Sequence, residues 1–383
     1  MNILILNYEY PPLGGGAGVC TQEQADGLAN YGHHVTVVTT WYKGLNEQES
    51  VGLLKIIRLK SKRLFLHESS IKEKLSWLFL AKQFLVGYCR ENTFDVCIAH
   101  FSIPGGAVAQ ILKKKFNIPF IIISHGHDIP WFFPKQMFLY HLLLYHKIRK
   151  ITGAADGIVV FNEYLKRKVI EFIPLKSKDK IFVIPNGCNT ALFKPDNEKK
   201  SKTFKIIFTG RLVAQKDPFT FLKALSLFNK KVTDYQVEII GDGVLKDKML
   251  HFVQKNKLES KVVFRGWIDK EEMLAAYQSA HVHVMTSLIE AMSVSALESL
   301  SAGTFLISSD AGGNARLIKN KINGMIVSDS NPKEIAQAIE WYYNEKFANK
   351  YTVPDEVLSK FRNDFDWHNI INLYNGLLEN IRK

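Results

Sequence analysis

The chain has few cysteines and no long apolar run, and each lack excludes a class of protein. Cys20, Cys89, Cys97 and Cys188 stand far apart without a CxxC pair. This spacing excludes a disulfide scaffold and a cysteine zinc site, and it fits a reducing compartment. No apolar stretch approaches the ~20 residues that span a bilayer, and the first six residues lack the basic segment of a signal peptide. We expect a cytoplasmic protein, soluble or at most peripheral at the inner face of the membrane.

Acidic residues are also in deficit, with 37 Asp and Glu against 50 Lys and Arg. Residues 1–184 hold 23 basic and 14 acidic residues, so this half carries +9 of the net charge of +13. Such a field suits an anionic membrane surface or a phosphorylated ligand. Nucleic acid is the other partner of a basic chain, but no recognised nucleic-acid module is present, so we expect none.

Short β-branched runs alternate with segments of helical period, which predicts βαβ units and parallel sheets. The length of 383 residues suits two domains. We expect the α/β class, with two Rossmann-like, doubly wound domains facing a cleft. The predicted strands are 2–6, 35–39, 96–99, 120–124 and 157–161 in the first half, and 205–209, 237–240, 262–264, 282–285 and 305–308 in the second.

A polar, turn-rich stretch at 185–203 predicts a linker between domains 1–184 and 204–364. The tail, 365–383, has apolar residues at helical spacing and predicts a packed helix.

Two loops of the first half follow predicted strands, where α/β domains bind ligands. The first, residues 10–18, contains Gly15 and Gly16, which allow close approach of an anion to backbone N–H groups. A flexible turn is the alternative, and the loop lacks the GxGxxG spacing of dehydrogenases. The second holds His125, suited to a hydrogen bond with a sugar hydroxyl.

The second half opens with a strand and the loop Thr209-Gly-Arg-Leu-Val-Ala-Gln-Lys. Arg211 offers a planar fork and Lys216 a point charge, a pair suited to a diphosphate; elsewhere such residues are usually solvated surface cations. Gly243 ends a further glycine turn after the strand 237–240.

Glu290 and Glu298 are eight residues apart. They share one side if both are helical; alternatively Glu290 lies in the loop before the helix and Glu298 within it. Either arrangement could accept bonds from sugar hydroxyls, although two surface glutamates are the commoner explanation on spacing alone.

The aromatic and basic stretch from Trp131 to Lys150, and less clearly 75–90, has the character of an interfacial helix. A helix that packs on its own sheet is the more frequent explanation.

Together these motifs resemble the retaining, nucleotide-sugar-dependent glycosyltransferases of family 4, which have the GT-B fold. The resemblance also includes Gly32-His-His-Val-Thr-Val-Val-Thr, Val263-Phe-Arg-Gly-Trp and Ser309-Asp-Ala-Gly-Gly, and it covers nearly the whole chain. It implies transfer of a hexose-type sugar from a UDP- or GDP-sugar to an envelope glycan or lipid-linked acceptor, with no cofactor and no catalytic metal.

The resemblance also implies roles for residues. Arg211 and Lys216 would bind the donor diphosphate, Glu298 the ribose, Glu290 the donor sugar, and the backbone near Arg265 the base. His125 would lie near the donor sugar, and the tail helix, 365–383, would cross back to complete the first domain. The catalytic set is His125, Arg211, Lys216 and Glu290; the donor-binding set is Gly15, Gly16, Arg211, Lys216, Gly243, Arg265, Glu290, Met292, Ser293 and Glu298.

Ala291 stands where many relatives have glycine. If that position needs φ > 0 or lies against the donor, alanine is strained or in the way. A catalytically silent nucleotide-sugar-binding protein therefore stays open, as does a nucleotide-sugar 2-epimerase on the same fold.

Overall fold

The computed structural model describes residues 1–66, 68–132 and 134–382, and it divides into two compact units. The first unit comprises 1–186 with 367–383, and the second comprises 187–366. Phe133 of the predicted interfacial stretch and Lys383 of the predicted tail helix lie outside the described residues. Within the described ranges, none of the helices has the length and apolar character that crossing a membrane requires.

The first unit is built on an eight-stranded sheet, parallel except for its first edge strand. In spatial order the strands are β3 (Gln48–Val51), β4 (Leu54–Leu59), β2 (His34–Thr40), β1 (Asn2–Leu6), β5 (Val96–His100), β6 (Phe120–Ile123), β7 (Gly157–Val160) and β8 (Ile181–Val183). β1 lies in the middle, with Leu6 paired to Val38 on one side and to Ala99 on the other. The strands β2 to β4 therefore lie on one side of β1, and the later strands β5 to β8 lie on the other side.

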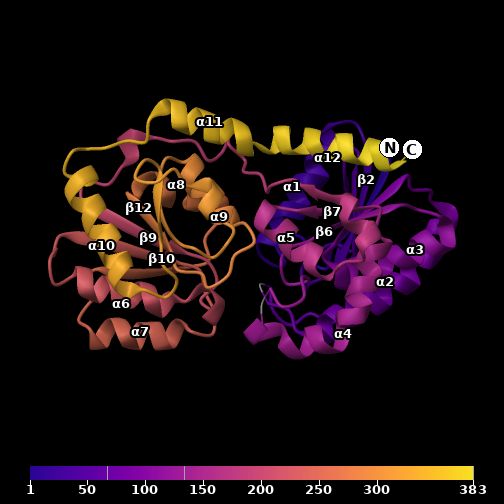
Figure 1. The fold of residues 1–383 in the computed structure, drawn as a ribbon, viewed down its shortest axis with the longest axis horizontal. Helices are drawn as coiled ribbons and strands as arrows, with labels where there is room; N and C mark the ends of the chain where they lie inside the picture. The colour runs from indigo at the N-terminus through magenta and orange to yellow at the C-terminus, as the bar shows by residue number, and fades with distance from the viewer. Residues whose placement is uncertain (67, 133, 383) are drawn as a thin grey trace. The chain divides into compact units, whose positions relative to one another are not determined.

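Six helices cover this sheet (Figure 1). They are α1 (Gly16–Asn30), α2 (Ile71–Glu91), α3 (Ala107–Phe116), α4 (Pro134–Ala154), α5 (Glu163–Phe172) and α12 (Trp367–Arg382). α2 packs on α3 and α3 on α4, whereas α12 packs on α1. The tail helix therefore completes the first unit, with the His33 ring nitrogen 2.7 Å from the Asn375 side-chain oxygen.

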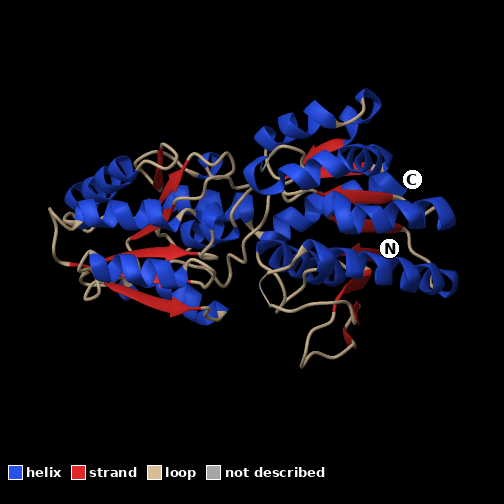
Figure 2. Ribbon diagram, turned by 90° about the horizontal axis from the view of Figure 1, so that it is seen from below, coloured by secondary structure: helices blue, strands red, loops and turns tan. Residues whose placement is uncertain are grey.

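The second unit has a six-stranded parallel sheet. Its order is β11 (Val262–Gly266), β10 (Tyr235–Ile240), β9 (Phe204–Thr209), β12 (Val282–Met285), β13 (Phe305–Ser309) and β14 (Gly324–Val327). The helices are α6 (Pro218–Phe228), α7 (Lys246–Lys255), α8 (Lys270–Ser279), α9 (Val294–Ser301), α10 (Pro332–Tyr342) and α11 (Asp355–Phe365). Figure 2 shows strands enclosed by helices in each unit. Because both faces of the strands are covered, the strands are buried apolar runs.

The α/β class with two doubly wound sheets is confirmed, and all ten predicted strands are present with ends shifted by at most two residues. The stretch expected as a linker differs from the prediction. From Gly187 onward it belongs to the second unit, where Phe193 packs edge-on against Tyr277 and the Phe193 carbonyl accepts a bond from Ser301. Because the stretch is mostly polar, its sequence gives no sign of these few contacts with the second unit.

Candidate active site

The candidate donor site lies at the carboxyl end of β9, where the strand order of the second sheet reverses. Parallel α/β sheets bind ligands at such switch points, because the loops of the two central strands diverge there. In this unit those loops are 210–217, after β9, and 286–293, after β12. They carry Arg211, Lys216 and Glu290.

Arg211 is a half-buried cation in the loop after β9. It follows Gly210, whose φ of 125° turns the chain sharply out of β9. Throughout the described part of the chain, no carboxylate forms an ion pair with Arg211. Its fork is therefore available to an anion such as a phosphate.

Lys216 and Glu290 contact each other directly, which their separate motifs did not predict. Lys216 Nζ lies 2.6 Å from Glu290 Oε2, and each side chain is only 14% exposed. Glu290 lies in the loop and Glu298 lies within α9, so the second of the two arrangements considered for this pair is the one present. The ion pair places a cation and a carboxylate side by side near Arg211.

Hydrogen bonds between the two loops hold this pair in place. The Gln215 side chain donates to the Ile289 carbonyl at 3.2 Å, and the Leu288 N–H donates to the Gln215 carbonyl at 2.9 Å. The Thr286 hydroxyl bonds to the carbonyls of Lys216 and Asp217. Asp217 precedes Pro218, the first residue of α6, but its side chain makes no cap bond to the helix backbone; it accepts from the Thr220 hydroxyl instead.

The glycine turn after β10 packs against the backbone of the Arg211 loop. A Cβ on Gly241 would lie 2.0 Å from the Gly210 carbonyl oxygen, and one on Gly243 would lie 2.6 Å from the Leu212 carbonyl oxygen. Gly243 therefore supports the loop that carries Arg211. On the neighbouring strand β11, the Arg265 side chain pairs with Glu272 at 3.1 Å and with Glu238 at 3.5 Å.

Ala291 is accommodated without backbone strain. The residue is buried, and it is not among the described non-glycine residues whose φ is positive. The glycine that this site requires is Gly313, where a Cβ would lie 2.4 Å from the Ala291 carbonyl oxygen. Met292 is buried beside it, and Ser293 caps α9 by accepting from the Ala296 N–H.

Glu298 is held by a buried network that sequence reasoning missed. The Tyr277 hydroxyl lies 3.4 Å from Glu298 Oε2 and also bonds to the Thr209 side chain. Burial, and then the Glu298 charge, raise the pKa of Tyr277 well above its ordinary value, so the phenol stays a donor.

The same network continues through His283, whose ring nitrogens lie 3.0 Å from the Thr209 hydroxyl and 2.9 Å from that of Ser299. Burial lowers the pKa of His283 to about 3, so the ring is neutral. The chain of bonds joins β9, β12, α8 and α9 beneath the candidate site. No local motif marks it, because its members are far apart in the sequence.

The remaining predicted site residues, Gly15, Gly16 and His125, lie in the first unit. Gly15 and Gly16 begin α1 directly after the loop that follows β1, and the Gly15 N–H points to a Glu9 carboxylate oxygen at 3.4 Å. The Glu9 carboxylate therefore lies at the N-terminus of α1, where an anionic ligand had been expected. These two glycines lie in a different unit from the other donor-binding candidates.

His125 follows β6 and pairs with a second histidine. Its Nε2 lies 2.9 Å from His100 Nδ1, and its ring packs against Phe101 and Phe161. Burial lowers the pKa of His125 to about 3, so the ring is neutral at physiological pH. The buried Asp128 fixes the loop by accepting from the His125 N–H. His100 at the end of β5 carried no sequence signal.

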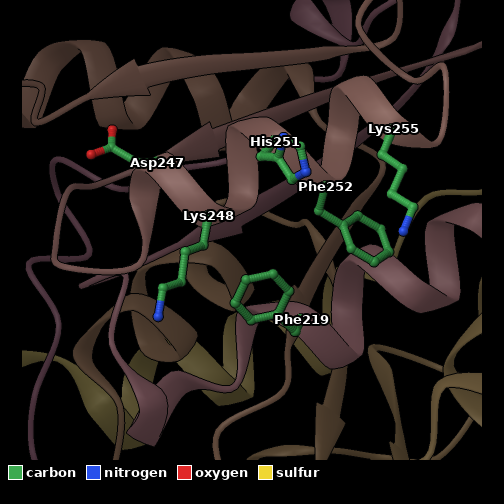
Figure 3. Close-up of a pocket in the computed structure, with 6 residues that line it drawn as sticks. All are labelled: Phe219, Asp247, Lys248, His251, Phe252 and Lys255. Atoms are coloured by element: carbon green, nitrogen blue, oxygen red, sulfur yellow. The ribbon is translucent and has the colours of Figure 1, made fainter.

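A separate hollow lies between α6 and α7 of the second unit (Figure 3). Its lining residues are Phe219, Asp247, Lys248, His251, Phe252 and Lys255. None of the sequence-predicted site residues lines it, so it is distinct from the candidate site.

Two family models match consecutive parts of the chain. The Glycosyltransferase Family 4 model matches residues 14–192, and the Glycosyl transferases group 1 model matches residues 189–356. An uncharacterized glycosyltransferase of Methanocaldococcus jannaschii is 26% identical over 99% of both chains. The UDP-Gal:alpha-D-GlcNAc-diphosphoundecaprenol alpha-1,3-galactosyltransferase of Escherichia coli is 28% identical over 73% of both.

Solved structures show the same fold. A sucrose-phosphate synthase from Thermosynechococcus elongatus superposes with a TM-score of 0.87 at 19% identity, covering 100% of this chain and 99% of that one. An Anabaena protein solved with UDP and glucose gives 0.78 at 17% identity, covering 99% of each. With two glycosyltransferase models spanning both units and the GT-B architecture throughout, the chain belongs to the family 4 glycosyltransferases.

Proposed function

We propose that this protein is a retaining glycosyltransferase that moves a hexose-type sugar from a UDP- or GDP-sugar to a cell-envelope glycan or lipid-linked acceptor. The observation that carries the proposal is the grouping of Arg211, the Lys216–Glu290 pair and Glu298 around one switch point of the second sheet. Membership of the family supports the reaction class.

The second unit binds the donor in this proposal. Arg211 and Lys216 take the diphosphate, Glu298 accepts bonds from the ribose hydroxyls, and Glu290 accepts bonds from the sugar. Negative charge grows on the β-phosphate as the sugar bond breaks, so the two cations stabilise the departing group. No catalytic metal or cofactor takes part, and the donor phosphate assists deprotonation of the acceptor hydroxyl.

The first unit takes the acceptor, and its His125 lies near the donor sugar, where it can bond to a sugar hydroxyl. A neutral imidazole is suited to this role, because it has one donor and one acceptor nitrogen. The net charge of +9 on residues 1–184 favours a place at the cytoplasmic face of an anionic membrane. The Escherichia coli relative, whose name gives a UDP-sugar donor and a diphospholipid-linked acceptor, supports both substrate classes.

A thermal-shift screen against UDP-, GDP-, ADP- and dTDP-sugars tests the donor half. A ligand that binds only the folded state raises the melting temperature by mass action, so the matching base gives the largest shift. Product analysis with that donor then separates transfer to an acceptor from epimerisation and from binding without turnover. Unchanged melting with all four donors would contradict the proposal.

A further inference from the structure

Large apolar side chains are exposed on the first half of α4. Phe138, Leu139, Leu142 and Leu143 are between 55 and 72% exposed. The first and third are four residues apart, as are the second and fourth, so each pair forms a stripe on consecutive turns. On the inner side of the same helix, His141 and Ile148 are buried. The exposed stripes are therefore additional to the surface that α4 packs on its own unit.

A second apolar stripe lies on α2. Ile71, Leu75 and Phe79 follow one another at intervals of four residues and are 51 to 66% exposed, whereas Trp77 and Leu85 on the opposite side are buried. α2 and α4 flank α3 in one layer, so their exposed sides point away from the same sheet (Figure 1). We call these seven exposed residues of α2 and α4 the apolar face. Scattered single apolar residues are normal on a surface, whereas stripes of three and four on two helices of one layer mark an interaction surface.

The apolar face lies at the same edge of the sheet as His125. Both helices follow a strand of the parallel sheet and lead back to another, so their first turns lie at the carboxyl ends of the strands. For α4, the His141 ring nitrogen lies 3.0 Å from the His127 carbonyl oxygen. The first turns of α4 thus contact the loop that carries His125.

A similar chain of contacts leads from α2. Lys74 lies over the ring of Tyr8, Tyr8 packs on Phe101, and Phe101 packs on His125. The apolar face and His125 therefore belong to one end of the first unit.

Positive charge accompanies the apolar face. The last turns of α4 carry the exposed Lys147, Arg149 and Lys150. Residues 101–150 contain seven Lys and Arg but one acidic residue, Asp128. Asp128 is buried and accepts bonds from Ser124, so it adds little negative potential to the surface. Exposed apolar residues beside cations match the acyl chains and anionic headgroups of a bilayer.

We propose that the apolar face inserts into an anionic membrane, and that the acceptor is consequently a lipid anchored in that membrane rather than a soluble glycan. This inference rests on the proposed function for the identity of the acceptor site. Docking by this face brings the carboxyl edge of the first sheet, with His125, to the headgroup region. A lipid-linked sugar could then reach the site without leaving the bilayer.

Vesicle co-sedimentation of the full chain tests the docking. We expect wild-type protein to bind vesicles of phosphatidylglycerol and phosphatidylcholine more tightly than phosphatidylcholine alone, and to lose binding as salt rises. L139S with L143S should lower the partition coefficient about tenfold or more, because two large side chains no longer leave water. L175S is the control, since Leu175 is 79% exposed in the same unit but follows α5 at the other edge of the sheet.

The inference is overturned if the double variant binds vesicles like wild-type protein, or if L175S binds as poorly as the double variant. A third result would also overturn it: wild-type protein does not bind vesicles but self-associates in analytical ultracentrifugation, whereas the double variant is monomeric. That result would assign the apolar face to a second copy of the chain. Vesicle binding needs no donor, and the nucleotide thermal shift needs no membrane. A failure of membrane docking can therefore be distinguished from a failure of the proposed donor binding.

Discussion

At the scale of single residues, the proposed function assigns Arg211 to the donor diphosphate. We expect Arg211→Ala to lower both kcat and donor affinity, with a loss of ~100-fold or more in kcat/KM, the scale seen when an electrostatic stabiliser is removed. Lys216→Arg should not restore wild-type activity, because a planar fork does not replace a point charge. Steady-state kinetics with the identified donor and circular dichroism of each variant provide the test. Near wild-type rates for Arg211→Ala and Lys216→Ala would exclude both from the diphosphate site.

Substitutions of Glu290 and Glu298 should affect the binding of different ligands. Glu290 neutralises Lys216 in the ligand-free protein, so Glu290→Gln should leave binding of the bare nucleoside diphosphate equal or tighter while it slows sugar transfer. Glu298→Gln should weaken the bare nucleotide, because a neutral amide accepts weaker bonds from the ribose. Isothermal titration with the nucleoside diphosphate and with the intact donor distinguishes the two. Equal weakening of the bare nucleotide by both variants would contradict these roles.

At the scale of elements, the buried network through Tyr277 explains how α8 and α9 hold Glu298 against β9. We expect Tyr277→Phe, which keeps the ring and removes the hydroxyl, to weaken nucleotide binding ~3- to 10-fold while kcat at saturating donor changes little. Combined with Glu298→Gln, the loss should be less than the sum of the single losses, because both changes break the same contact.

Tyr235→Phe is the matched control for this change. Tyr235 is as deeply buried in the same unit, and its hydroxyl bonds to Asn229 outside the network. Tyr277→Phe removes the bonds to Glu298 and Thr209 and Tyr235→Phe removes the bond to Asn229. Both variants should therefore lose stability, but only Tyr277→Phe should affect the nucleotide. Equal nucleotide affinity in the two variants would reduce Tyr277 to a packing residue.

The elements that sequence reasoning predicted are those whose pattern is strong locally. The central strands are continuous apolar runs, so they were recognised, as was the edge strand β11, whereas β3, β4, β8 and the four-residue β14 were missed. β3 is polar and exposed, β4 alternates with Lys55 and Arg58, and β8 has three residues. The loops after β9 and β12 were recognised as site loops by position. The Lys216–Glu290 contact and the role of Tyr277 were not, because contacts between distant residues follow from the register of the sheet and leave no local pattern.

At the scale of the whole molecule, each unit has its own sheet and core, and the chain completes the first unit only with its last helix. Buried residues of α12 include Ile370, Ile371, Tyr374, Leu377 and Leu378. The first unit therefore cannot be complete until the whole second unit has been synthesised. The contact that enforces this order is the packing of α12 on α1, which Gly27 makes close.

Gly27→Ala tests that contact. Replacing a glycine inside a helix by alanine usually stabilises it by ~1 kcal/mol. A Cβ on Gly27, however, would lie 2.5 Å from Ile371 Cγ1, and overpacking of this kind costs ~1–3 kcal/mol. We expect the variant to lower the melting temperature of the first unit and to speed amide hydrogen exchange in α1 and α12. Gly87→Ala in α2 is the control, because its new Cβ would meet no atom within 4 Å and the helix should gain stability. If Gly27→Ala were as stable as Gly87→Ala, α12 would not pack on α1 in solution, and the first unit would not depend on the end of the chain.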